Sequence, residues 1–242
     1  MTVTIVTGAA GGLGTAIARA LAERGDTLVL ADIDLPGAET EAERLTVEGF
    51  GVMAVAVDIA SPASCRAMAE ATLSRHGRID ALVHAAGIDA PPGRAWEEDD
   101  AHWRKIIDVD LSGAFWAAKA VLPAMLAQKA GRIVFLGSVA ARVPSIGTSA
   151  AYSAAKAGIN GLAIGLSAQV EARGVRVNVI APGPTGTGVA MSESERRAYE
   201  GIYPLGEGGT APVVAACIYL LGPGGDWMSG SVLNVSGGRF RG

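Results

Sequence analysis

Cysteine, aromatic residues and clustered positive charge are all scarce in this sequence of 242 residues. Its two cysteines, Cys65 and Cys217, lie in no C-x-x-C motif and beside no group of histidines, so we interpret them as buried cytosolic thiols. Only 5% of the residues are aromatic and 18% are charged, the formal net charge is −4, and no run of Lys or Arg occurs. This composition argues against nucleic acid and anionic membrane surfaces as partners.

The sequence also shows neither the pattern of a leader sequence nor that of a clear membrane span. The first residues, MTVTIVTG, contain no basic region and pass directly into a strand pattern, so we expect no signal peptide. The longest weakly charged run, 150–170, contains Lys156, Asn160 and Gln169, and we interpret it as a buried helix. Half of the residues are hydrophobic, which is typical of a globular chain. We predict a soluble, cytoplasmic protein.

Short β-branched runs alternate with longer Ala-rich segments along the whole chain, without repeats or a linker. The predicted strands are Val3–Thr7, Thr27–Ala31, Gly51–Val57, Ala81–His84, Arg132–Leu136, Arg176–Ile180 and Ser231–Val235. Helical patterns occupy residues 13–24, 37–48, 62–76, 98–128, 150–172 and 210–221. This alternation predicts one α/β domain, residues 1–242, with a parallel sheet covered on both faces by helices.

The first predicted strand leads into a glycine-rich turn, TGAAGGLG, with Gly8, Gly12 and Gly14, and then into an Ala-rich helix. Glycine allows a diphosphate to approach the backbone, and the helix N-terminus offers it free N–H groups and a partial positive charge. A glycine-rich β–α turn without a ligand is the alternative interpretation.

Two carboxylates close the next two predicted strands. Asp32 ends the second strand, where it can accept both hydroxyls of an adenosine ribose and repel a 2′-phosphate. Since position 11 is glycine and the segment DIDLPG adds only acidic residues, NAD is favoured over NADP. Asp58 ends the third strand and could reach the adenine edge. Either carboxylate could instead cap a helix, although Asp34 fits the first capping role better than Asp32, and Ser61 fits the second as well as Asp58 does.

Six segments together resemble the short-chain dehydrogenase/reductase family, in order and in approximate spacing. They are TGAAGGLG, the strand-end Asp32, AAG at 85–87, Ser138, YSAAK at 152–156 and PGPTGT at 182–187. The resemblance implies a Rossmann-type, doubly wound α/β fold with seven parallel strands in the order 3-2-1-4-5-6-7. It also implies a nicotinamide dinucleotide and reversible hydride transfer between an alcohol and a ketone. The chain is similar to the branch that contains 3-oxoacyl reductases and secondary-alcohol dehydrogenases.

The resemblance also assigns a set of cofactor-binding residues. They are Gly8, Gly12, Leu13, Gly14, Asp32, Asp58, Ile59, Ala86, Gly87, Tyr152, Lys156, Pro182, Gly183, Thr185 and Thr187. Thr185 and Thr187 would meet the nicotinamide carboxamide and so expose one face of the ring. A plain turn is the alternative for their Pro/Gly-rich segment.

Tyr152 and Lys156 interrupt a run of small residues, SAAYSAAKAG, four positions apart. On a helix both side chains share one face. An adjacent ammonium and an oxidised nicotinamide favour the phenolate, so that the hydroxyl can act as an acid and base near neutral pH. In the family the Lys also holds the nicotinamide ribose. Ser138, at the end of the strand RIVFLG, can hydrogen-bond the substrate oxygen. The alternatives are an ordinary amphipathic pair and a helix-capping serine.

The chain departs from the family pattern at two places. His84 and Ala85 stand where the family often has two asparagines, and we expect His84 to be structural. Asp110 stands where the fourth catalytic residue is usually Asn, whose backbone carbonyl holds a water. Three outcomes are open for Asp110. The backbone role survives, or an ionised carboxylate raises the proton affinity of Lys156 and weakens its hold on the phenolate, or the side chain only closes hydrogen bonds at an irregularity of the helix. We expect activity to survive.

These observations predict an NAD-dependent secondary-alcohol dehydrogenase or ketoreductase with a small-molecule substrate and no metal. The substrate region is expected at 188–205, with 139–148 and 88–96. A 3-oxoacyl-carrier reductase is the first alternative, although Glu207 stands where such enzymes often carry Arg. A non-catalytic NAD-binding sensor or scaffold is the second. The resemblance also implies a homotetramer or homodimer that pairs through the 98–128 and 150–172 helices.

Overall fold

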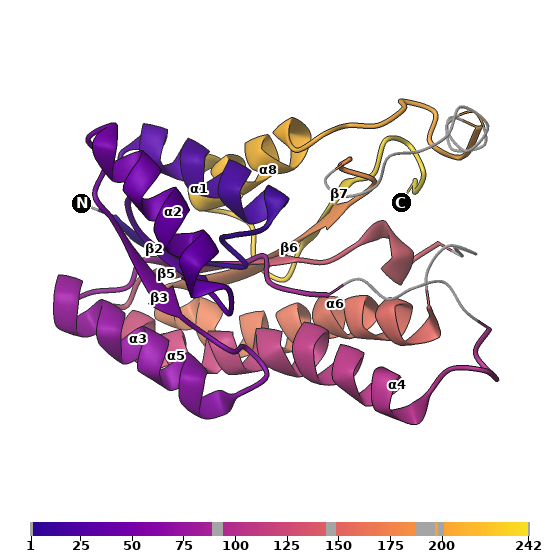
Figure 1. Ribbon diagram of the computed structural model, residues 1–242, viewed down its shortest axis with the longest axis horizontal. Helices are drawn as coiled ribbons and strands as arrows, with labels where there is room; N and C mark the ends of the chain where they lie inside the picture. The colour runs from indigo at the N-terminus through magenta and orange to yellow at the C-terminus, as the bar shows by residue number, and fades with distance from the viewer. Residues whose placement is uncertain (1, 89–93, 144–148, 187–196, 198–200, 242) are drawn as a thin grey trace.

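A parallel sheet between two layers of helices forms the protein in the computed structural model (Figure 1), which describes residues 2–88, 94–143, 149–186, 197 and 201–241. The strands are β1 Val3–Thr7, β2 Thr27–Asp32, β3 Val52–Ala56, β4 Ala81–His84, β5 Gly131–Leu136, β6 Val175–Pro182 and β7 Val232–Val235. The helices are α1 Gly12–Arg24, α2 Leu35–Val47, α3 Pro62–His76, α4 Asp100–Ile106, α5 Gly113–Gln128, α6 Ala150–Val170 and α8 Ala211–Leu221. The strand order β3-β2-β1-β4-β5-β6-β7 confirms the predicted topology.

The sheet is buried on both faces, which explains why its strands are continuous apolar runs. Successive residues of a strand point to opposite faces. In β1, Ile5 therefore faces the layer of α3, α5 and α6, and Val6 faces the layer of α1, α2 and α8. Figure 1 shows these two helical layers on either side of the strands.

The cap of α2 is the residue that the sequence favours, and the cap of α3 is one of the two that the sequence leaves open. Asp34 caps α2 by accepting a hydrogen bond from the Gly37 amide (3.2 Å), and Ser61 caps α3 by accepting one from the Ser64 amide (3.3 Å). These caps satisfy backbone donors at the helix starts. Asp32 and Asp58 are therefore not the caps of these helices.

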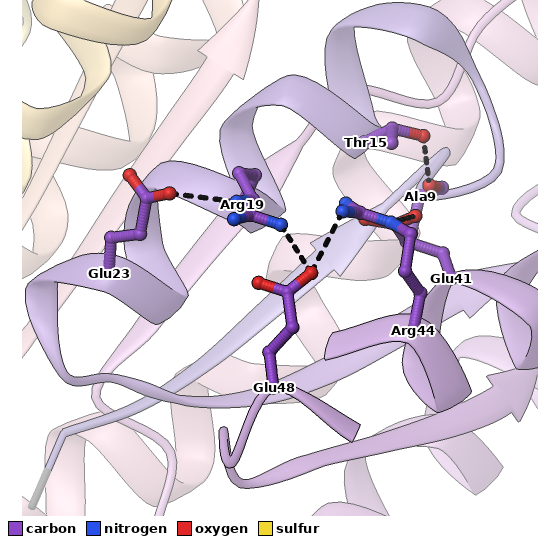
Figure 2. Close-up of polar contacts among 7 residues, drawn as sticks. All are labelled: Ala9, Thr15, Arg19, Glu23, Glu41, Arg44 and Glu48. Carbon is purple, nitrogen blue, oxygen red and sulfur yellow. Dashed lines mark hydrogen bonds and ion pairs between the residues drawn. The ribbon is translucent and has the colours of Figure 1, made fainter. Parts of the chain in front are cut away.

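The outer surfaces of α1 and α2 are joined by a network of charged side chains (Figure 2). Glu48 Oε1 accepts hydrogen bonds from Arg19 (2.7 Å) and Arg44 (3.2 Å), so one carboxylate ties the two helices together. Inside the network, the Thr15 hydroxyl donates to the Ala9 carbonyl (3.0 Å) and fastens α1 to the glycine-rich turn. The ion pairs are partly exposed, and such pairs contribute little each.

The helix expected over 98–128 is interrupted, and the sequence prediction is wrong in this respect. Between α4 and α5 the segment Ile107–Ser112 is a π-helix. By length and composition the whole run of 29 residues, Asp100–Gln128, is the one helix in the described part of the chain that could cross a membrane. Its small and apolar side chains Ala114, Ala117 and Val121 are buried in the core beside the sheet, as in any helix that covers a sheet.

Candidate active site

The glycine-rich turn lies at the carboxyl ends of β1 and β4, where the strand order reverses. Gly8 has a positive φ of 70°, and a Cβ there would lie 2.6 Å from the Ala86 amide nitrogen. A Cβ at Gly14 would lie 2.0 Å from the Gly8 carbonyl oxygen. Glycine therefore permits the close approach of the two strand ends and of α1. Gly11 precedes α1 without a side-chain cap, so the first-turn amides can receive an anion such as a diphosphate.

The carboxylate of Asp32 is held at the end of β2 by two backbone amides. Its Oδ2 accepts from the Ala10 amide (2.9 Å) and its Oδ1 from the Asp34 amide (3.0 Å). Beside it lies a cavity of about 510 Å³. The predicted cofactor residues that line this cavity are Gly8, Asp32, Asp58, Ile59, Ala86 and Gly87. A glycine turn and a fixed strand-end carboxylate in one cavity fit the diphosphate and ribose of a dinucleotide.

One charged residue of this cavity was missed by the sequence analysis. Lys105 on α4 lines it together with Val109. The two residues are four positions apart, a spacing that places them on one helix face. The four-residue spacing of Lys105 and Val109 is visible in the sequence, but nothing in the sequence indicates that this helix face turns toward the end of β2.

A second cavity, of about 270 Å³, brings the four predicted catalytic residues together: Asp110, Ser138, Tyr152 and Lys156. Leu13, Gly87, Pro182, Gly183 and Thr185, all predicted to contact the cofactor, line it as well. Ala85, Gly87 and Ile88 line both cavities, so the two are adjacent. A ligand that bridges them would reach from Asp32 to Tyr152.

Ser138 follows β5 through Gly137, and Tyr152 and Lys156 rise from the first two turns of α6. Ser149 caps α6 by accepting from the Tyr152 amide (3.1 Å), which fixes where that helix begins. The Ser138 hydroxyl oxygen accepts from the Ala140 amide (3.1 Å), so the serine also caps the short turn after β5. Its hydroxyl proton can still be donated to a ligand. The Lys156 ammonium lies 5.3 Å from the centre of the Tyr152 ring.

Asp110 uses its side chain within the site. Its Oδ2 lies 3.2 Å from Lys156 Nζ, and its Oδ1 accepts from the Ile88 amide (2.8 Å). The side chains of Lys156 and Asp110 are 8% and 0% exposed. Lys156 Nζ also donates to the Leu136 carbonyl (3.5 Å). Of the alternatives left open by the sequence, the carboxylate does face Lys156, and it does so from an irregular stretch of helix.

His84 occupies a structural place in the sheet. The residue is 1% exposed; its Nδ1 lies 2.9 Å from the Thr7 hydroxyl, and its ring meets Phe135 edge-on. Burial, and to a smaller extent the positive charge of Lys156, together lower the pKa of this imidazole from 6.5 to about 3. The ring is therefore neutral at physiological pH.

Some predicted residues do not line the cavities or cannot be placed. Gly12 begins α1, and Gly14 packs against Gly8, so both shape the turn without lining either cavity. Thr187 lies outside the described residues, as do most of the segment 188–205 and the parts 89–93 and 144–148 of the expected substrate region. Arg142, from that region, lies 5.1 Å from the Phe240 ring in the C-terminal tail.

Known proteins that resemble this chain do so over nearly its whole length. Residues 2–198 match the short chain dehydrogenase family. The chain is 34% identical to the 3-oxoacyl-(acyl-carrier-protein) reductase FabG of Salmonella typhimurium, over 98% of this chain and 97% of the relative. It is 35% identical to a galactitol 2-dehydrogenase (L-tagatose-forming) of Cereibacter sphaeroides (96% and 92%). It is also 35% identical to a cis-4-hydroxycyclohexanecarboxylate dehydrogenase of Sinomonas cyclohexanicum (98% and 95%). The crystal structure of gox2181 superposes with a TM-score of 0.95 at 33% identity, over 98% of this chain and 95% of that one.

Proposed function

Since the chain belongs to the short chain dehydrogenase family, and is thus an oxidoreductase as its sequence predicts, we propose that it transfers a hydride between NAD and a secondary alcohol or ketone. The observation that carries this proposal is the cavity in which Ser138, Tyr152 and Lys156 meet. That cavity is adjacent to the one lined by the strand-end carboxylate Asp32. The bound dinucleotide would supply the group that accepts or donates the hydride.

In this proposal the chain's own residues handle the proton. Tyr152 takes the proton of the substrate hydroxyl during oxidation and returns it during reduction. The Lys156 charge, 5.3 Å from the ring centre, favours the phenolate and so supports the first of these steps. Ser138, whose oxygen already accepts from the Ala140 amide, donates its hydroxyl proton to the substrate oxygen and orients it beside Tyr152.

The test of catalysis is a panel of small secondary alcohols with NAD⁺, followed by replacement of the proton carrier. Tyr152→Phe removes one hydroxyl and should lower kcat/KM by at least about 100-fold, with NAD binding retained. The matched control is Tyr219→Phe, on the outer face of α8, which should leave the rate unchanged. Full activity of Tyr152→Phe would refute the assignment. The absence of turnover across the panel would instead favour a non-catalytic NAD-binding sensor.

The preference for NAD over NADP is supported by the charges beside the adenosine end of the cavity. Asp32, Asp34 and Asp58 all line it, and they would repel a 2′-phosphate. Lys105 is the cation among the described lining residues. Asp32→Asn should raise kcat/KM for NADP⁺ relative to NAD⁺ by at least about tenfold, since each 1.4 kcal/mol is worth that factor. The control Lys105→Met should not raise it. A wild-type preference for NADP⁺ would contradict the proposal.

A 3-oxoacyl-carrier reductase is the second candidate, and the similarity to the Salmonella FabG protein favours it. The two dehydrogenase relatives, which are as similar, favour oxidation of a ring or sugar alcohol. Reduction of a 3-oxoacyl thioester at a higher kcat/KM than that for any alcohol in the panel would decide for the reductase.

We also propose a single domain over residues 1–242, a cytoplasmic location, and a homotetramer or homodimer. The oligomeric state can be measured by light scattering.

A further inference from the structure

The ion pair between Asp110 and Lys156 is buried more deeply than any other ion pair between described residues. The loop after β4 covers it. A Cβ at Gly87 would lie 3.2 Å from Lys156 Nζ and 3.3 Å from Asp110 Oδ1, so the backbone of this loop packs closely over both charged groups. The Ile88 amide holds Asp110 Oδ1 at 2.8 Å, which fixes the carboxylate against the ammonium. Charges that are buried to this degree interact more strongly, and are screened less by salt, than charges on the surface.

The other titratable groups near this pair can be named. Asp110, Tyr152 and Lys156 are the titratable side chains among the described residues that line the cavity. His84, beneath the cavity on β4, is close enough for the Lys156 charge to lower its pKa, and it stays neutral. Among the described residues, the charges beside the Tyr152 side chain are therefore one positive and one negative group that contact each other.

We propose that Asp110 is the counter-ion of Lys156, so that the buried pair is electrically neutral and Tyr152 exchanges its proton at a higher pH than beside Lys156 alone. Asp110 is then a positioning residue, which acts on Tyr152 through Lys156. The catalytic consequence rests on the proposed function: alcohol oxidation would rise to half of its maximal kcat/KM at an alkaline pH. The charge arrangement itself can be tested without turnover.

The experiment follows the ionisation of Tyr152 in the full-length protein by the ultraviolet absorbance of tyrosinate. Each spectrum is corrected by subtracting that of the same protein carrying Tyr152→Phe. The variants are Asp110→Asn, Lys156→Met and the double variant. Asn keeps an oxygen for the Ile88 amide while removing the charge. The matched control is Asp108→Asn, which removes the same charge from an exposed position in the same π-helix.

The proposal predicts a definite order of ionisation midpoints. Asp110→Asn should lower the midpoint by about one pH unit or more, and Lys156→Met should raise it by a similar amount. The double variant should ionise close to the wild type, because it replaces one neutral pair by another, and Asp108→Asn should not move it. If Asp110→Asn leaves an unpaired buried ammonium and fails to fold, the double variant compared with Lys156→Met isolates the same charge. The double variant should ionise about one unit lower.

Two results would overturn the proposal. One is a Tyr152 ionisation midpoint in Asp110→Asn that is equal to or higher than that of the wild type. The other is a double variant whose midpoint equals that of Lys156→Met. The pH profile of kcat/KM separates this outcome from failure of the proposed function. Midpoints in the predicted order without any turnover would support the counter-ion and refute the dehydrogenase. If turnover depends on Tyr152 but Asp110→Asn changes neither the tyrosinate titration nor the pH profile of kcat/KM, the dehydrogenase is supported and the counter-ion is refuted.

Discussion

Replacing His84 with asparagine is predicted to change how the stability of the protein responds to acid, because this imidazole is buried in its neutral form. Burial lowers its pKa from 6.5 to about 3, so between these values the unfolded chain binds a proton that the folded chain does not. Stability is therefore fully present above pH 6.5 and is lost as the pH falls through this window toward 3. Each pH unit costs about 1.4 kcal/mol, and the whole window up to about 5 kcal/mol.

The assay is urea unfolding of wild type and His84→Asn at a series of pH values and one protein concentration, followed by tryptophan fluorescence. Asparagine can keep the hydrogen bond to the Thr7 hydroxyl but loses the contact with Phe135, so the variant should be less stable at neutral pH. The difference in unfolding free energy between wild type and His84→Asn should shrink by about 1 kcal/mol per pH unit as the solution is acidified below about pH 6. Carboxylates titrate in both proteins and cancel in the difference.

The control for this experiment is His102→Asn, which replaces a partly exposed imidazole on α4 that pairs with Glu98. It should not reproduce the slope of the buried site. A free-energy difference between wild type and His84→Asn that stays constant from neutral to acid pH would refute the reasoning, as would one that widens.

Four further substitutions test what holds the fold together, each by the change in the free energy of urea unfolding. Glu48→Gln, in the surface network between α1 and α2, should cost no more than about 1 kcal/mol, and less at high salt. Gly8→Ala should cost well over about 2 kcal/mol and weaken dinucleotide binding, because it combines a positive φ with a Cβ 2.6 Å from the Ala86 amide. Gly25→Ala, with a positive φ but no atom within 4 Å, should cost only about 1 kcal/mol. Ser61→Ala removes the cap of α3 and should cost about 1 kcal/mol.

Most of the sheet could be predicted from the sequence because its strands are buried on both faces. Such strands appear as short apolar runs between glycine and polar residues, and β1 and β4 begin and end at the predicted residues. β6 extends two residues beyond the prediction, to Pro182. There Ala181 and Pro182 pair with β7, a contact that depends on where a strand fifty residues later comes to lie.

The sequence predicted which residues form the site, but it did not predict the contacts between them. Motif order indicated Tyr152, Lys156 and Ser138, and the structure brings them into one cavity. The sequence left open an irregularity of the helix at Asp110, but the π-helix of Ile107–Ser112 itself was not predicted. The carboxylate there binds the Ile88 amide and Lys156, which come from distant parts of the chain. Such contacts exist only once the sheet and its helices have assembled.

The two departures from the family pattern, at His84 and Asp110, converge on the same ammonium group. Asp110 pairs directly with Lys156, and His84 lies close enough for the Lys156 charge to lower its pKa. A neutral imidazole can lie near an ammonium at little cost, whereas a protonated one would add a second positive charge to a buried site. The carboxylate offsets the charge that remains. We therefore interpret the histidine and the aspartate as parts of one charge arrangement around Lys156, which in our proposal changes the environment of Tyr152 and leaves in place the residues proposed to contact the substrate.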